Sequence, residues 1–161
     1  MTADRAALLA RLLEGAPRFV RRLEDEPAGS LEALLERAEA IALAMPEEEQ
    51  LELLAAHPRI GAQPGSISSL SYREQGYDRD PGTAELTARL ERLNDEYERR
   101  FGFRFVVFVN GHPREQIADL LEEGLAAPRD AEKRRALRDV IAIARDRLAR
   151  ITGSQGSGNE R

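Results

Sequence analysis

Apolar residues recur every three or four positions along most of the chain, which is the spacing of one buried face of an α-helix. Within residues 83–100, for example, Leu86, Leu90, Leu93 and Tyr97 share one face. Proline, glycine and serine interrupt the pattern repeatedly and separate one helix from the next. The pattern predicts helices over residues 3–13, 18–23, 31–45, 46–56, 83–100, 113–125 and 130–151, and a short helix that opens at Ser71.

Local signals mark where several of these helices begin. Ser30 and Thr83 are predicted N-caps, because a hydroxyl oxygen can accept a hydrogen bond from a free backbone N–H of the first turn. Pro46 is predicted as the first residue of its helix, followed by glutamates that the helix dipole favours. The predicted buried face of that helix consists of Leu51, Leu54 and Ala55.

One segment breaks the helical pattern with aromatic and β-branched residues. Residues 103–109 stand between Gly102 and an Asn110-Gly111 pair that is typical of a turn, and they predict a short extended buried segment. Because one such segment cannot form a sheet, we expect an all-α fold, a single-domain helical bundle over residues 1–152. Residues 153–161 are rich in glycine and serine and predict a disordered tail.

Composition and charge argue against several classes of function. The chain has no cysteine, which removes disulfides and thiol nucleophiles and fits a reducing compartment. Its net charge of −5 argues against nucleic-acid binding, because the overall field repels phosphate groups. The longest apolar run, residues 105–109, is far shorter than the ~20 residues of a membrane span, and no signal peptide is visible. Without a C-terminal Ser-Lys-Leu signal, the sequence predicts a soluble cytoplasmic protein.

His57 is the residue whose setting most favours chemistry. It precedes Pro58, which disfavours helical geometry in the residue before it, so His57 is expected at or just past a helix end. A histidine can give or take a proton near neutral pH, as a general acid or base does. The other histidine, His112, follows the predicted turn and is expected on the surface. Two histidines without cysteine predict no metal site, and the lack of a glycine-rich phosphate loop predicts no nucleotide cofactor.

Two further sets of polar residues have more than one interpretation. Ser71 and Glu74 have the spacing of a helix capping box, which needs no function, but Glu74 and Gln75 could instead face a pocket. Arg147 lies among arginines typical of a solvated helix face, yet it shares its own face with isoleucines and could point inward. A buried arginine needs an anionic partner, and a substrate carboxylate would serve. Sequence spacing leaves both questions open.

Four motifs follow one another along the chain. They are His57-Pro58-Arg59-Ile60-Gly61, Ser71-x-x-Glu74-Gln75, Leu93-Asn94-x-x-Tyr97-Glu98-x-Arg100-Phe101-Gly102-Phe103-x-Phe105-Val106, and Ile143-x-x-x-Arg147-Leu148. In this order they resemble the OHCU decarboxylase family over residues 51–148; OHCU is 2-oxo-4-hydroxy-4-carboxy-5-ureidoimidazoline, the second unstable product of urate oxidation. The chain departs from the family pattern in its N-terminal third, which lacks a tryptophan often found there, and around His112.

The resemblance implies an enzyme, a carboxy-lyase that converts this small anionic substrate to (S)-allantoin without a cofactor. It implies that His57 is the acid/base and that Glu74 pairs with it or polarises the substrate. The substrate-binding residues that it implies are Pro58, Ser71, Gln75, the main chain of Phe105, Val106, Val107, Phe108 and Val109, and Arg147. The family is an all-α bundle and often dimeric, so a homodimer is expected.

Two other functions remain open at this point. In the first, the chain is a non-catalytic helical binding or dimerisation module in which His57 and Arg147 are structural. In the second, the chain is an enzyme that hydrolyses or isomerises a related ureido compound, because acid/base groups alone do not determine the reaction.

Overall fold

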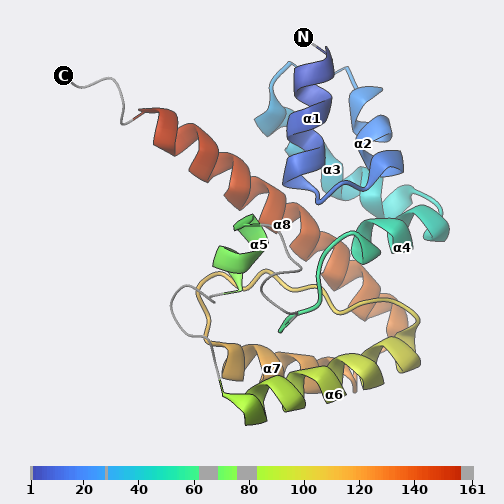
Figure 1. Cartoon of the computed structure of the whole chain (residues 1–161). Coiled ribbons are helices and arrows are strands. Elements are labelled where there is room, and N and C mark those ends of the chain that lie inside the picture. Colours follow the sequence, from blue (N-terminus) through green and yellow to red (C-terminus); the bar gives the residue numbers. More distant parts are fainter. Residues whose placement is uncertain (1, 28, 62–68, 76–82, 157–161) are drawn as a thin grey trace. The chain divides into compact units, whose positions relative to one another are not determined.

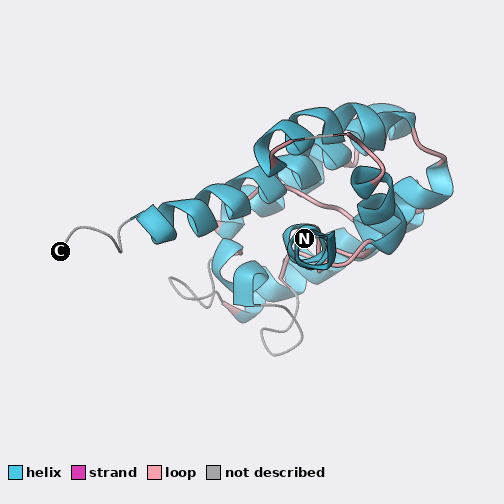
Figure 2. Cartoon of the chain, turned by 90° about the horizontal axis from the view of Figure 1, so that it is seen from above, coloured by secondary structure: helices cyan, strands magenta, loops and turns pink. Residues whose placement is uncertain are grey.

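The computed structural model describes most of the chain and shows an all-α fold (Figures 1 and 2). The described residues are 2–27, 29–61, 69–75 and 83–156. They form eight α-helices and no strand, which confirms the predicted fold class. The Cα positions divide the chain into two compact units, residues 1–56 with 137–161, and residues 57–136. One domain over residues 1–152 stays a prediction.

The first unit combines helices from both ends of the chain. It contains α1 (Thr2–Leu12), α2 (Pro17–Glu24), α3 (Leu31–Ala44), α4 (Glu47–Ala55) and the part of α8 (Arg129–Gly156) from residue 137 onward. α2 packs against α1, α3 and α4 (Figure 1). Full burial of one leucine or phenylalanine stabilises a fold by about 1.5–3 kcal/mol. Such fully buried side chains in this unit include Leu9, Leu12, Leu13, Phe19, Leu23, Leu34, Leu35, Leu53 and Leu54.

Helix α4 differs in two details from its prediction. Pro46 is the N-cap, not the first helical residue, because its backbone is extended at φ −57° and ψ 148°. Gln50 is buried beside Leu53 and Leu54, whereas the predicted Leu51 is half-buried and Ala55 is exposed. The Gln50 amide donates hydrogen bonds to the carbonyls of Ala42 (2.9 Å) and Leu43 (3.3 Å) at the end of α3. These bonds turn a polar side chain inward and rotate the buried face of α4.

The second unit places two helices side by side. α6 (Ala84–Phe101) packs against α7 (Arg114–Gly124) at the base of Figure 1, and α5 (Ser69–Glu74) also belongs to this unit. Both predicted N-caps are confirmed, since Ser30 Oγ accepts from Ala33 N and Thr83 Oγ1 from Leu86 N, each at 3.1 Å. The predicted apolar stripe of α6 is buried, as are Leu137, Val140, Ile141, Ala144 and Leu148, which share one face of the helix predicted over residues 130–151.

Residues 103–109 form the predicted non-helical segment, and most of their side chains are buried. The Tyr97 ring lies among the phenylalanines around it, with ring centroids 5.8 Å from Phe103 and 5.1 Å from Phe105. The segment ends in the predicted turn, where Asn110 (φ 48°) and Gly111 (φ 78°) are both left-handed. His112 follows it and is exposed, as predicted.

Other predictions lie partly outside the described residues. Residues 61–69, between two predicted helices and rich in glycine and serine, are described only at their ends, and Ser69 already begins α5. Ser71 therefore lies inside that helix and is not the N-cap of a capping box. Residues 78–82, where Pro81 and Gly82 interrupt the helical pattern before Thr83, lie outside the described residues. α8 continues through Gly156, into the predicted tail, and residues 157–161 lie outside the described residues.

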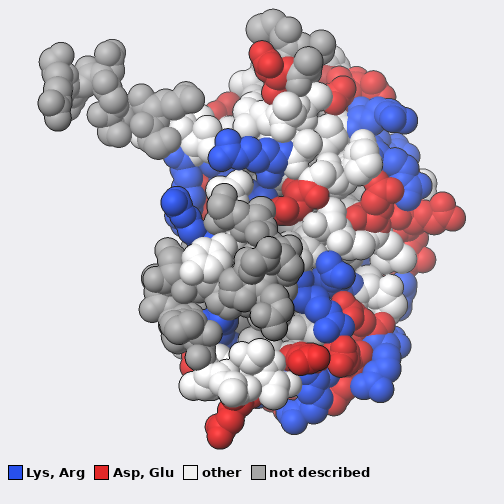
Figure 3. Space-filling view, viewed as in Figure 1, with Lys and Arg blue, Asp and Glu red and all other residues white. Residues whose placement is uncertain are grey.

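Charged side chains of opposite sign lie next to one another on the face shown in Figure 3. In the first unit, Arg18 pairs with Glu52 at 2.6 Å and Arg22 with Glu49 at 2.5 Å. The hydrogen bond from Arg22 lowers the pKa of the Glu49 carboxyl. Such exposed pairs contribute little to stability, because water screens the two charges. No helix in the described residues is long and apolar enough to span a membrane.

Candidate functional site

His57 is buried just beyond the C-terminal end of α4. Ala56 is the C-cap of that helix, so His57 lies past its end, as the proline after it predicts. Its side chain is 3% exposed, and Pro58 beside it is half-buried. The chain then continues without helical structure to Gly61. We refer to residues 57–61 as the histidine segment.

The side-chain amide of Gln75 binds the backbone of the histidine segment at two points. Gln75 Nε2 donates to the carbonyl of Arg59 at 3.0 Å, and Gln75 Oε1 accepts from the N–H of Gly61 at 2.9 Å. Gln75 follows the last residue of α5 and is 4% exposed. The structure therefore brings Gln75 together with the segment that begins at His57, and this amide holds backbone that has no helical partners of its own.

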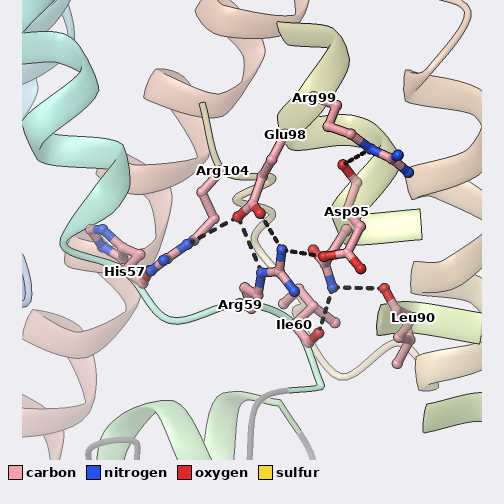
Figure 4. A network of polar contacts seen from close by, with 9 residues as sticks. His57, Arg59, Ile60, Leu90, Asp95, Glu98, Arg99 and Arg104 are labelled. Atoms are coloured by element: carbon pink, nitrogen blue, oxygen red, sulfur yellow. Dashed lines mark hydrogen bonds and ion pairs between the residues drawn. The ribbon is translucent and has the colours of Figure 1, made fainter. Parts of the chain in front are cut away.

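Helix α6 binds the same segment from another direction. Asn94 Nδ2 donates to the carbonyl of Ile60 at 3.0 Å and to that of Leu90 at 2.9 Å (Figure 4). Gly61 has φ +83°, and a Cβ atom built there would lie 3.1 Å from Leu90 Cδ1. Only glycine fits this position without strain, because the backbone is left-handed and lies against α6.

A cluster of charged side chains reaches His57 itself. Arg104, from residues 103–109, donates from Nη1 to the carbonyl of His57 at 2.7 Å, and its Nε lies 3.5 Å from Glu98 Oε1. Glu98 also binds Arg59 with both carboxylate oxygens, and Asp95 accepts from Arg59 Nη2 at 2.8 Å (Figure 4). The hydrogen bonds from Arg59 to Glu98, opposed by burial and reinforced by Asp95, raise the pKa of the Arg59 guanidinium.

The other predicted residues of α5 lie close to Gln75 along the chain. Ser71 is 3% exposed, and its carbonyl accepts a hydrogen bond from Gln75 N at 2.9 Å. Glu74 is half-buried. Ser71 and Gln75 lie one helical turn apart and are both buried, so α5 and the residue after it direct two polar side chains away from solvent.

The predicted pocket-lining segment is held by a second polar network. The side chain of Arg135 donates from Nη1 to the carbonyl of Val106 at 3.1 Å and lies 5.0 Å from the centroid of the Phe105 ring. Glu132, which is 4% exposed, accepts hydrogen bonds from Arg135 Nη2 at 2.8 Å and from the Tyr97 hydroxyl at 2.9 Å. Burial and then the charge of Glu132 raise the pKa of Tyr97. One main-chain carbonyl of the predicted lining, that of Val106, is thus already bound.

Arg147 is buried, with 1% of its side chain exposed, so the solvated-face interpretation is wrong. Its anionic partner in the structure is Glu14, whose Oε1 lies 2.9 Å from Arg147 Nη2. Nη1 donates to the carbonyls of Arg11 (3.0 Å) and Leu12 (3.4 Å) at the end of α1. Arg147 belongs to the first unit, whereas the predicted site residues from His57 to Val109 belong to the second.

Sequence reasoning assigned no role to the residues that hold the histidine segment. Arg59, Asn94 and Glu98 appeared only as letters of motifs, and Arg104 was an unassigned position within one. Arg104 did leave a signal, because it is the single charged residue in the otherwise apolar residues 103–109. In the described part of the chain, no three His, Cys, Asp or Glu side chains are grouped so that they could hold a metal ion.

Comparison with known proteins identifies relatives that match most of the chain. The family model described as OHCU decarboxylase matches residues 1–149. The chain is 31% identical to the 2-oxo-4-hydroxy-4-carboxy-5-ureidoimidazoline decarboxylase of Halalkalicoccus jeotgali over 135 residues, covering 82% of this chain and 75% of that protein. It is also 31% identical to the mouse protein of that name over 137 residues, covering 81% and 75%.

A larger relative is a uric acid degradation bifunctional protein of Bacillus subtilis. The chain is 34% identical to it over 134 residues, which are 81% of this chain and 26% of that protein. A second bifunctional protein, from Bacillus sp. (strain TB-90), is matched over 29% of its length. The chain therefore spans only a little over a quarter of these two relatives.

Two solved structures share the fold. A crystal structure of OHCU decarboxylase in the presence of (S)-allantoin has a TM-score of 0.71 and 21% identity, covering 89% of this chain and 96% of that one. A crystal structure of (S)-allantoin synthase has a TM-score of 0.67 and 23% identity, covering 92% and 50%. Since the family model covers nearly the whole chain and relatives above 30% identity are matched over three quarters of their length, this chain belongs to the OHCU decarboxylase family.

Proposed function

We propose that this protein is a cofactor-independent decarboxylase that converts OHCU to (S)-allantoin, with His57 as the acid/base. The observation that carries the proposal is the setting of His57, a buried imidazole whose backbone is bound by a side chain from another segment of the same unit. A group that moves a proton must be held within hydrogen-bond reach of the reacting atom, and this setting restricts its position.

The chemistry requires no electron sink from the protein. When the bond between the ring and its carboxylate breaks, carbon dioxide leaves and the electron pair delocalises into the adjacent C=N and carbonyl system. One proton then adds to the ring, and its delivery to a single face determines the chirality of the product. The protein contributes orientation, hydrogen-bond donors where charge develops, and that proton. We assign the proton transfer to His57, with Glu74 pairing with it or polarising the substrate.

The proposed binding residues have different support. An amide nitrogen carries two N–H donors, so Gln75 can bind both Arg59 and an oxygen of the ring or ureido group. Ser71 supplies a buried hydroxyl one turn away on α5, and Pro58 and the main chain of residues 105–109 would shape the pocket. Arg147 would contact the anionic end of the substrate; a guanidinium shielded from water binds anions strongly.

The proposed dimeric state rests on the resemblance to the family, and the proposed compartment rests on the sequence. We propose a cytoplasmic homodimer that acts on a small anionic substrate without a metal or other cofactor. The absence of cysteine is compatible with a reducing compartment.

The experiment is to generate OHCU freshly from urate, add the parent protein or its His57→Ala variant, and follow both circular dichroism and released carbon dioxide. We expect fast, one-handed allantoin formation with the parent. The variant should be slower by about 10²–10⁴-fold, the usual contribution of a general acid or base, and its product should approach racemic. His112→Ala is the matched control, because His112 is exposed, and it should keep the parent rate.

Each other outcome has a distinct meaning. A parent protein that is folded yet leaves the spontaneous decay of OHCU unchanged would reject the proposed activity and favour a binding module. Turnover without release of carbon dioxide would indicate hydrolysis or isomerisation. A His57→Ala protein with full rate and full product chirality would remove His57 from the mechanism.

A further inference from the structure

We propose that Glu98 and Arg104 are positioning residues that determine where the imidazole of His57 stands. This inference rests on the proposed function, since it assigns the means by which the acid/base is held. Glu98 reaches the histidine segment on both sides of Pro58, through Arg104 to residue 57 and directly to Arg59 (Figure 4).

The first connection runs through Arg104. Its Nη1 donates to the carbonyl of His57 at 2.7 Å, a short bond with a charged donor, and its Nε lies 3.5 Å from Glu98 Oε1. The side chains of Arg104 and Glu98 are 33% and 28% exposed, so water screens this pair only partly. Glu98 therefore holds the guanidinium in the place from which it binds the His57 backbone.

The second connection is direct. Arg59 donates from Nε to Glu98 Oε1 at 3.1 Å and from Nη2 to Glu98 Oε2, which is the two-pronged geometry that suits guanidinium and carboxylate groups. Asp95 also accepts from Arg59 Nη2, but the Asp95 side chain is 52% exposed, and its ion pair in this cluster is with Arg59. Among these two carboxylates, Glu98 is the one that joins both arginines.

Pro58 stands between the two points at which the cluster holds the histidine segment, and it restricts the backbone there. The ring of Pro58 restricts its own φ and limits the backbone of His57 before it. Once the carbonyl of His57 and the side chain of Arg59 are held, few backbone rotations remain that could displace the imidazole. The two arginines and two carboxylates of the cluster carry no net charge, and Arg104 binds the backbone carbonyl of His57, so we assign the cluster a positional role.

The test compares Glu98→Gln, which keeps the shape of the side chain, with the matched control Asp95→Asn, measuring kcat, KM and the optical purity of allantoin. We expect Glu98→Gln to lower kcat by about 10- to 100-fold, as displacement of a catalytic group does, with KM within about twofold. The optical purity of the allantoin should fall together with kcat. Asp95→Asn should retain all three. A folded Glu98→Gln protein with parental kcat and chirality would refute the proposal.

Arg104→Met provides a second route if Glu98→Gln does not fold. It should also lower kcat with little change in KM, and the double variant should lose less than the product of the two single losses, because Glu98 acts partly through Arg104. Fully multiplicative losses would show that the two residues act independently and would overturn the assignment.

A spectroscopic readout separates this inference from the proposed activity. The chain has two histidines, so proton NMR shows one buried and one exposed imidazole, distinguished by the His112→Ala variant. Glu98→Gln should shift or broaden the His57 signals and leave those of His112 in place, while Asp95→Asn changes neither. This result would support the positioning role even if the parent failed to decarboxylate OHCU, and unchanged His57 signals would reject it.

Discussion

The side-chain amide of Gln75 donates a hydrogen bond to the main-chain carbonyl of Arg59 at 3.0 Å, two residues beyond His57. The same amide accepts from Gly61 N at 2.9 Å, so one buried side chain replaces two backbone partners that this non-helical segment lacks. The family resemblance assigns Gln75 a contact with the substrate, and the structure shows that the same side chain also holds the backbone of the histidine segment.

Replacement of Gln75 by leucine should destabilise the protein. The change leaves the carbonyl of Arg59 and the N–H of Gly61 without these bonds, at about 1–3 kcal/mol for each buried polar group. Urea unfolding followed by circular dichroism measures the loss. Arg73→Leu, at an exposed position on the same helix, is the control and should stay within about 0.5 kcal/mol of the parent. Equal stabilities for both variants would contradict the assigned role.

Gly61→Ala should also reduce the free energy of unfolding, by about 1–3 kcal/mol. The reason is twofold: the backbone has φ +83°, and the new Cβ would approach Leu90 Cδ1 to 3.1 Å. Gly29→Ala is the matched control, because no atom lies within 4 Å of its added Cβ. Thermal and urea unfolding of the two variants give the comparison, and a Gly61→Ala protein as stable as the control would show that the segment relaxes freely.

The ion pair of Arg147 with Glu14 predicts a large loss of stability when one partner is removed. Arg147→Met leaves a half-buried carboxylate and two α1 carbonyls without this donor, and breaking a buried pair typically costs about 3–5 kcal/mol. Arg150→Met, whose side chain is 72% exposed, should cost less than about 1 kcal/mol. If Arg147 also contacts the substrate, Arg147→Met should have a higher KM than Glu14→Gln when the two variants are equally stable. Equal KM values would confine Arg147 to a structural role.

Tyr97 predicts a loss of stability at alkaline pH. Its pKa is raised in the folded state, by burial and then by Glu132, so the folded chain keeps a proton that the unfolded chain releases above pH about 10. Stability from this group is therefore complete below that pH and declines as pH rises, by about 1.4 kcal/mol per pH unit. Tyr97→Phe should show a shallower decline in urea unfolding above pH about 10. Parallel declines for parent and variant would contradict the assignment.

Local patterns in the sequence were sufficient for much of the fold. The apolar spacing predicted the helices, hydroxyl side chains predicted the caps at Ser30 and Thr83, and the proline after His57 predicted the end of α4. These features depend on residues within one or two turns of each other, and such short-range rules can be applied without knowing the fold. The four ordered motifs likewise indicated the family that the comparisons confirm.

Tertiary structure alone decided which polar groups meet. Gln50 is buried, although apolar spacing predicted other residues for the buried face of α4, because its amide can donate hydrogen bonds to carbonyls at the end of α3. Arg104 bonds to His57 across 47 positions of sequence, and Arg147 to Glu14 across 133. Helical periodicity predicts which face of a helix is buried, but it does not predict which residues of other segments pack against that face. The sequence by itself therefore determined the elements, the family and the candidate histidine, whereas the partners that hold these arginines and the histidine backbone depend on how distant segments pack.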